Sequence, residues 1–429
     1  MKRLAGIAAL LALQLPVLAV AADIGADGTT IIRIEERSVP GFSKQTVVPA
    51  TQYLGFDAED IRVKGLSLHF YGWGRVDLAD DSSESTKPRS TDGNFSYGYL
   101  QYRFDKANAG LKAGRFFVYE GVAAEQVDGV YARTDLNKGF TVSAFGGIPV
   151  KLDRASSSKG KYIGGGRLGY RYGGILDLGL SGLLEGDSPT PYGKDKRQLA
   201  GVDLWLSPHR MVELSGRSSY NGTTEEVAEH SYLLALRPLS GLTAAVSYTD
   251  IRLKDYFTFT NTPSSLFNPN NDEKYRSHGL TATYRITQLP FPAEVSLDYK
   301  HYKRDSKGNS DRYGGELRLT PVEKLSTGLA VARIAAANGI MSYSEVRAYG
   351  LYYTGRYSVN LDAIANIYDE KVYGKKNAYE VTGGCGYQVT PALRVSGEAT
   401  YADNPWYDGD VRGLLRVTYS YNNKKGAAQ

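Results

Sequence analysis

An alternating stretch at residues 343–369 constrains the fold more than any other feature of this sequence. A tight turn at 354–356, with the sequence Thr-Gly-Arg, divides it into two segments of about ten to twelve residues each. Apolar side chains line one face of the second segment, at Val359, Leu361, Ala363, Ala365 and Ile367. The other face is mostly polar, at Ser358, Asn360, Asp362, Asn366 and Tyr368, with Ile364 as its apolar exception. This period of two predicts β-strands, and their length suits tilted strands that cross a bilayer.

Short and long connections alternate along the rest of the chain. The short ones are tight turns at 136–139, 173–174, 207–209, 238–241, 288–291, 321–324, 354–356 and 389–392. The long ones are polar, at 152–160, 185–196, 221–229, 258–273, 303–311, 337–342, 369–376 and 402–408. This alternation predicts an all-β, transmembrane, antiparallel up-and-down barrel with short periplasmic turns and longer extracellular loops. The hairpins predict about 20 strands, within a range of about 18 to 22.

The amino-terminal region has the pattern of an export signal. Lys2 and Arg3 precede an apolar run at 4–20, and Ala19-Val20-Ala21 offers a cleavage site of small residues. Residues 1–21 are therefore predicted to be a signal peptide, with a transmembrane anchor as the alternative. Beyond them no apolar run is long enough for a spanning helix, so an exported chain that enters a membrane must do so as a closed barrel.

The chain after the signal divides into three predicted parts. Residues 22–64 are broken by Pro40, Gly41 and Pro49, and they are expected to form a periplasmic extension or a segment docked in the lumen. The barrel is expected at 65–421, and 422–429 form a carboxy-terminal tail.

Composition agrees with a membrane barrel and disfavours other classes. The chain has 33 Tyr and 48 Gly, which suit aromatic girdles and barrel strands. Its 51 basic and 46 acidic residues leave a net charge of +5, too weak to indicate a nucleic-acid partner.

Enzyme signatures are absent from the sequence. There is no Cys-x-x-Cys-His haem site, no Gly-x-Ser-x-Gly elbow and no phosphate-binding loop, and the five histidines lack metal-ligand spacing. The single cysteine, Cys385, lies in a strand pattern and is interpreted as inert. We therefore expect no enzymatic activity, no cofactor and no metal.

The last predicted strand, at 411–421, resembles those of Gram-negative outer-membrane porins. Gly413, Leu415, Val417, Tyr419 and Tyr421 share one of its faces, and Arg412, Arg416, Thr418 and Ser420 share the other. The run Leu-Lys-Ala-Gly-Arg at 111–115 and the run Val-Asp-Gly-Val-Tyr at 127–131 are similar to paired strands of larger porins and porin-like proteins. The resemblance covers residues 65–421 and implies a location in the outer membrane.

The resemblance also implies a function. We expect passive diffusion of small polar or ionic solutes through a charged aqueous lumen. The alternative is a structural sheath for a multihaem cytochrome in a porin–cytochrome electron conduit. The expected partners are outer-membrane lipid, solutes or ions, a periplasmic or lumen-docked cytochrome in the alternative, and further copies of the chain in a homo-oligomer.

Strand alternation assigns charged side chains to the lumen, because charge facing lipid is costly near the bilayer midplane. The basic candidates for the pore lining are Arg75, Arg103, Lys112, Arg285, Arg318, Arg412 and Arg416. The acidic candidates are Asp77, Glu294, Asp298, Glu316, Glu345 and Asp362. Inward aromatic residues at Tyr71, Trp73, Tyr349 and Tyr353 are interpreted as girdle or packing residues, with a sugar-stacking track as the alternative.

Overall fold

The computed structural model describes residues 23–38, 45–79, 91–150, 161–186, 196–252, 273–305, 308–337 and 342–422. The predicted signal peptide, the predicted loop at 258–273 apart from Glu273, and the predicted tail beyond Asn422 lie outside these ranges.

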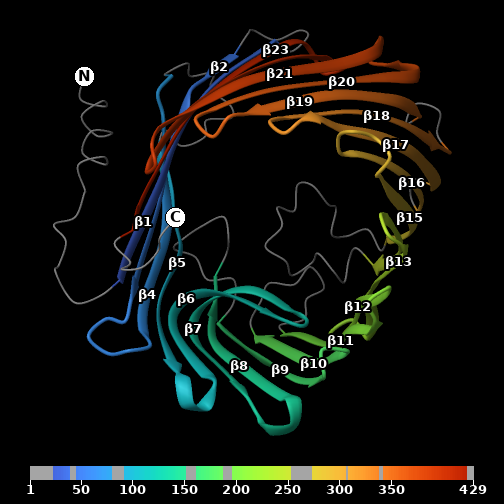
Figure 1. The fold of residues 1–429 in the computed structure, drawn as a ribbon. Helices are drawn as coiled ribbons and strands as arrows, with labels where there is room; N and C mark the ends of the chain where they lie inside the picture. Colours follow the sequence, from blue (N-terminus) through green and yellow to red (C-terminus); the bar gives the residue numbers. More distant parts are fainter. Residues whose placement is uncertain are drawn as a thin grey trace.

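Antiparallel strands form a single closed wall (Figure 1). Around the first half of the chain the strands are β1 Asp23–Ser38, β2 Gln45–Val47, β3 Pro49–Glu59, β4 Leu66–Asp77, β5 Thr91–Phe104, β6 Ala109–Glu120, β7 Ala123–Asp135, β8 Phe140–Pro149, β9 Tyr162–Tyr172, β10 Leu176–Gly186 and β11 Lys196–His209. The remaining strands are β12 Val212–Asn221, β13 Glu226–Leu239, β14 Leu242–Arg252, β15 Lys274–Ile286, β16 Ala293–Arg304, β17 Gly308–Val322, β18 Leu325–Ala336, β19 Tyr343–Tyr353, β20 Tyr357–Val372, β21 Lys375–Thr390, β22 Leu393–Asn404 and β23 Tyr407–Asn422.

Within the described ranges the wall contains 22 strands, one fewer than the 23 segments, because β2 and β3 form one strand. Both pair with β1, and only Val48 separates them. The predicted number of about 20 was close, and the observed number is at the upper end of the expected range. The predicted turn at 354–356 is confirmed, since β19 ends at Tyr353 and β20 begins at Tyr357.

The barrel closes through β1, which pairs with β3 on one side and with β23 on the other. Ile32, for example, lies opposite Ala50 of β3 and opposite Leu415 of β23. The expectation that residues 22–64 form a separate extension or lumen plug is therefore wrong, because most of them are wall. The barrel begins at Asp23 and not near Gly65.

The physical reason for this error is the outward face of β1. Gly28 and Thr30 fall on that face and interrupt the apolar alternation. The missing side chain of Gly28 is replaced by the ring of Tyr419, which packs against it across the closing pair. An aromatic ring can cover a strand glycine in this way. Pro49, which looked like a breaker, is the first residue of β3, a position where a strand tolerates proline.

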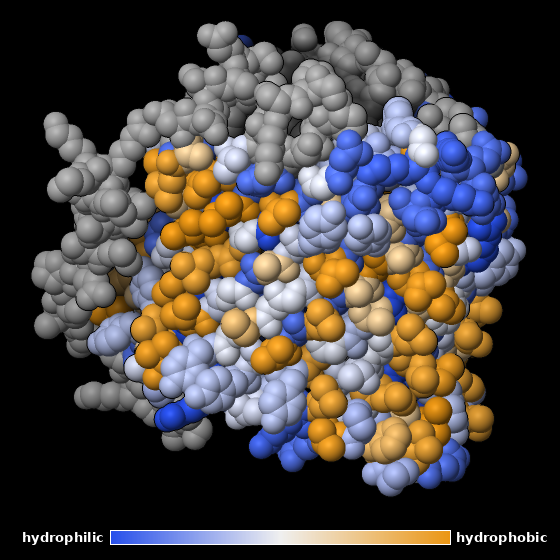
Figure 2. Space-filling model, turned by 90° about the horizontal axis from the view of Figure 1, so that it is seen from above, coloured by the Kyte–Doolittle hydropathy of each residue, from blue (hydrophilic) through white to orange (hydrophobic). Residues whose placement is uncertain are grey.

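The two faces of the wall differ in chemistry. The strand register places the alternating apolar residues of neighbouring strands on one face, such as Leu297 and Leu361, which are 61% and 57% exposed. Figure 2 shows hydrophobic side chains spread over the described outer wall, with the largest group of hydrophilic ones at the upper right of the view. Among the described residues, no helix is long and apolar enough to cross a membrane, a finding that concerns helices alone.

Candidate functional site: the inner face of the barrel

The β6–β7 hairpin bends away from the wall and lies along the inside of β8–β11 (Figure 1). A row of glycines in cross-strand register marks the bend, with Gly114 opposite Gly129 and Gly129 opposite Gly147. Gly114 has φ of +129°, which side chains rarely adopt, and a Cβ at Gly129 would collide with the carbonyl oxygen of Gly146. The wall can therefore fold sharply here because these positions carry no side chain.

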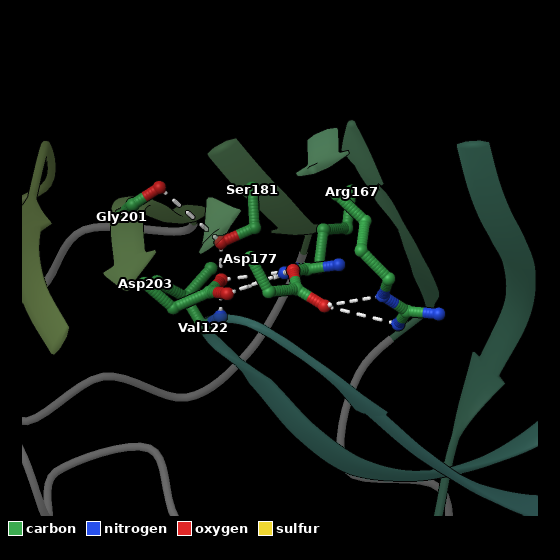
Figure 3. Close-up of polar contacts among 7 residues, drawn as sticks. Val122, Arg167, Asp177, Ser181, Gly201 and Asp203 are labelled. Carbon is green, nitrogen blue, oxygen red and sulfur yellow. Dashed lines mark hydrogen bonds and ion pairs between the residues drawn. The ribbon is translucent and has the colours of Figure 1, made fainter. Parts of the chain in front are cut away.

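The tip of this hairpin is anchored on the inner face of β10 and β11. The backbone N–H of Val122 donates a hydrogen bond to Ser181 Oγ at 3.1 Å, and the Ser181 hydroxyl donates to the carbonyl of Gly201 at 3.4 Å (Figure 3). The Val122 side chain occupies the space where a Cβ of Gly201 would lie. The tip therefore lies on β10 and β11 because Gly201 leaves room for it.

Apolar side chains are buried between the hairpin and the wall. Phe116 is 1% exposed and Val127 is fully buried. The cluster consists of Phe116, Val118, Ala123, Val127, Phe145, Ile163 and Leu183. Its burial gives the bent conformation a hydrophobic driving force, so the hairpin is a fixed part of the fold.

A buried ion triad connects the hairpin to the wall. Arg197 Nη1 of β11 lies 2.5 Å from Glu125 Oε1 of the hairpin and 3.1 Å from Glu185 Oε2 of β10. The three side chains are 5%, 1% and 0% exposed. Two carboxylates without their shared guanidinium would be very costly at this burial, so the triad fixes the hairpin in place.

A second set of ion pairs lies on the inner face beside the hairpin tip (Figure 3). The Arg167 guanidinium of β9 donates to both carboxylate oxygens of Asp203, and its Nη2 lies 2.5 Å from Asp203 Oδ2 and 3.1 Å from Asp177 Oδ1. Asp177 also accepts from Arg171 at 2.9 Å. The set joins the basic residues of β9 to the acidic residues of β10 and β11 and presents a polar wall to the lumen.

The wall formed by β15–β20 carries a further network of opposite charges. Arg318 lies 3.8 Å from Glu294 and 3.3 Å from Glu316, and Arg285 lies 3.2 Å from Glu294. Higher on this wall Arg347 pairs with Asp362 at 2.5 Å. Arg312 pairs with Asp298, and Tyr349 donates to Glu316. Most of the charges on this wall are therefore balanced locally.

The strand register puts every predicted pore-lining residue on the face opposite the exposed apolar side chains. The structure brings Arg285, Glu294, Glu316 and Arg318 into one network, joins Asp298 to Arg312 and Asp362 to Arg347, and pairs Arg412 with Glu380 and Asp410. It does not bring the remaining candidates into these networks.

Each of these remaining candidates has its own surroundings. Asp77 accepts from the backbone N–H of Val48 at 3.2 Å. Lys112 lies against the rings of Tyr99 and Tyr131. The others are Arg75 and Arg103 on β4 and β5, Glu345 on β19 and Arg416 on β23.

Sequence reasoning missed the ion triad and the pairs of β9–β11. Asp177 and Asp203 lie between alternating leucines and valines, so alternation could have found them. The buried position of Glu125 and Arg197 had no local signal, because it depends on a hairpin that folds across other strands. The density of glycines at 146–147 and 164–166 was the available clue.

Within the described part of the chain, no group of three or more His, Cys, Asp and Glu side chains has the geometry of a metal site. The chemistry of the inner face is thus that of paired charges and aromatic rings.

A closed antiparallel barrel with an apolar outer face and a charged inner face has the architecture of a porin-type β-barrel. No protein-family model and no curated protein matches the sequence. Among solved structures, the chain is similar to Acinetobacter baumannii OccAB4, with 12% identity, 93% of this chain and 98% of that chain covered, and a TM-score of 0.47.

Two further structures are similar at the same level. The outer membrane protein opdK from Pseudomonas aeruginosa matches with 11% identity, 93% and 99% coverage of the two chains, and a TM-score of 0.47. The translocation pore of the P pilus usher PapC matches with 10% identity, 94% and 100% coverage, and a TM-score of 0.49.

Proposed function

We propose that this chain is an outer-membrane channel through which small polar or ionic solutes diffuse passively. The observation that carries the proposal is the inward-folded β6–β7 hairpin. A barrel of 22 strands encloses a wide lumen, because barrels of about 16 to 18 strands already leave an aqueous channel. We infer that a hairpin fixed at Ser181 and Arg197 narrows such a lumen for the solutes that pass.

The charges of the inner face are the proposed lining of this channel. Basic and acidic side chains are paired with one another on β9–β11 and on β15–β20, so an ion that passes meets both signs on each wall. Such paired charges orient polar solutes without giving the strong selectivity that a ring of one sign produces. The 13 candidates named from the sequence belong to this proposed lining.

The cytochrome sheath gains no support from the described residues. The hairpin and its apolar cluster occupy part of the inner space that a folded cytochrome would need. We also propose no catalytic role for the charged groups of the inner face, many of which form ion pairs with one another.

Conductance across a planar lipid bilayer tests the proposal. The refolded chain should give stable single-channel steps. A variant in which residues 118–125 are replaced by Asn-Gly should give larger steps, because the hairpin no longer narrows the lumen. A correctly folded wild-type barrel without conductance would contradict the channel function. Conductance steps of equal size in the wild type and the variant would show that the hairpin is not the constriction.

A further inference from the structure

We propose that the inner wall formed by β1, β3, β4 and β5 binds organic ammonium cations at a gap beside Gly55. The inference deepens the proposed channel function and rests on it, since it names a class of solute that the lumen would hold. The gap lies between a carboxylate on β1 and a tyrosine ring on β4.

The strand register builds this gap. Asp27 lies opposite Gly55, and Gly55 lies opposite Tyr71, so the three residues form one row on the inner face. Because Gly55 has no side chain, the Asp27 carboxylate leans into the space where a Cβ would lie. A carboxylate thus faces an aromatic ring with only a glycine between them.

Further tyrosines border the gap. The Tyr53 ring lies 6.4 Å from the Tyr71 ring at an interplanar angle of 25°, and the Tyr71 ring lies 5.6 Å from the Tyr97 ring at 19°. The Tyr97 and Tyr99 rings follow at 5.9 Å. This row places aromatic rings and phenol groups side by side on the inner face, and both kinds of group attract cations.

The local charge favours a cation over an anion. Asp57, another carboxylate, lies on the same face next to Asp27, in the row of Gly25. Asp57 is hydrogen-bonded to His69 at 2.5 Å, which leaves Asp27 as the carboxylate without a basic partner in the described part of the chain. Two neighbouring carboxylates attract a positive solute, and the ring of Tyr71 adds a surface for its alkyl groups.

The neighbouring strand β6 places an ammonium group of the protein itself against the last ring of this row, Tyr99 of β5. Lys112 Nζ lies 5.1 Å from the centre of the Tyr99 ring and 5.5 Å from the centre of the Tyr131 ring. This intramolecular contact shows the geometry that a bound organic ammonium would reproduce beside Tyr71. By contrast, the hydroxyl group of the inward-facing Tyr349 on β19 already donates a hydrogen bond to Glu316 and accepts one from Arg318.

The test measures binding of tetramethylammonium to the refolded, full-length barrel in detergent by titration calorimetry, with maltose and acetate as comparison solutes. Asp27→Asn and Tyr71→Leu should each weaken tetramethylammonium binding by about tenfold. Tyr343→Leu is the matched control, because Tyr343 is also an inner-face tyrosine packed against another tyrosine, at 5.9 Å from Tyr368. It should leave binding unchanged.

Each outcome decides the proposal. Equal binding by the wild type and both site variants would overturn it, and so would a loss in all three variants. Maltose binding that depends on Tyr71 but not on Asp27 would replace the cation site by a saccharide track. Heat-modified migration on gels confirms that each variant is folded. Calorimetry requires no conductance. Cation binding by a folded barrel that gives no conductance in bilayers would therefore contradict the channel function and still support the cation site.

Discussion

The Arg197 guanidinium lies 2.5 Å from the Glu125 carboxylate, and this contact joins the inward hairpin to the barrel wall. Arg197 also pairs with Glu185, so one cation balances two buried carboxylates. The hairpin position thus depends on a charge that is almost completely removed from solvent. Such pairs are costly to break from one side, because a carboxylate is left buried without its partner.

The first prediction follows from this contact. Arg197→Met should lower the free energy of unfolding by about 3–5 kcal/mol, because Glu125 and Glu185 lose their shared partner. Conductance of this variant should also become noisier, since the hairpin is no longer held. Urea unfolding in detergent and single-channel recording measure the two effects.

Arg347→Met is the control for this experiment. Arg347 pairs with Asp362 at 2.5 Å, but its side chain is half exposed, so its loss should cost at most about 1 kcal/mol. Equal losses of stability in the two variants would show that the buried triad has no special role.

The second prediction concerns the bend of the hairpin. Gly129→Val should prevent the bent conformation, because its side chain would collide with the backbone of β8 at Gly146 and Gly147. The yield of folded barrel should fall, and the remaining channels should have larger steps. Heat-modified migration on gels and conductance measure these effects.

Gly383→Val is the matched control, because a Cβ at Gly383 meets nothing within 4 Å. Gly383 lies on the outward face of β21, opposite Leu361. This variant should fold with normal yield and conductance. A poor yield of folded barrel for both variants would mean that valine is generally harmful in these strands. The bend would then not explain the effect of Gly129→Val.

The third prediction concerns ion preference. Arg285→Gln together with Arg318→Gln leaves Glu294 and Glu316 without their basic partners. The cation-to-anion permeability ratio should rise by roughly tenfold, because the wall then carries a net negative field. Reversal potentials in a salt gradient measure the ratio.

Arg276→Gln serves as the control for ion preference. Arg276 pairs with Asp250 at 2.8 Å, and the register puts both on the outward face with His278 and Tyr248. Its neutralisation should leave the ratio unchanged. An unchanged ratio in the double variant as well would show that the network does not line the conducting path.

Much of the wall could be predicted from the sequence because a barrel strand has a two-residue period. Val359, Leu361 and Ile367 show it directly, and the turns between such strands are short. The same period placed the charged candidates on one face. Prediction failed at β1, where Gly28 and Thr30 replace apolar residues, because the ring that covers Gly28 comes from the other end of the chain.

The inward hairpin was missed for a different reason. The alternation of β6 and β7 is that of wall strands, and nothing local distinguishes a strand that leaves the wall. The docking of Val122 on Ser181 and the pairing of Glu125 with Arg197 join residues about 60 to 70 positions apart, which a two-residue period does not encode.

The last prediction tests the closure of the barrel. Deletion of residues 23–59 should abolish folding, because β1 supplies the pairing surface for β23 and β3 supplies that for β4. A lumen plug would behave in the opposite way, since its removal would leave a folded barrel with larger conductance. Tyr419→Ala is the milder variant at the same seam: it uncovers Gly28 and should lower the unfolding midpoint without opening the barrel. Gel migration and bilayer recording of the deletion variant distinguish the two outcomes, and a folded, conducting deletion variant would show that β1 is dispensable to the wall.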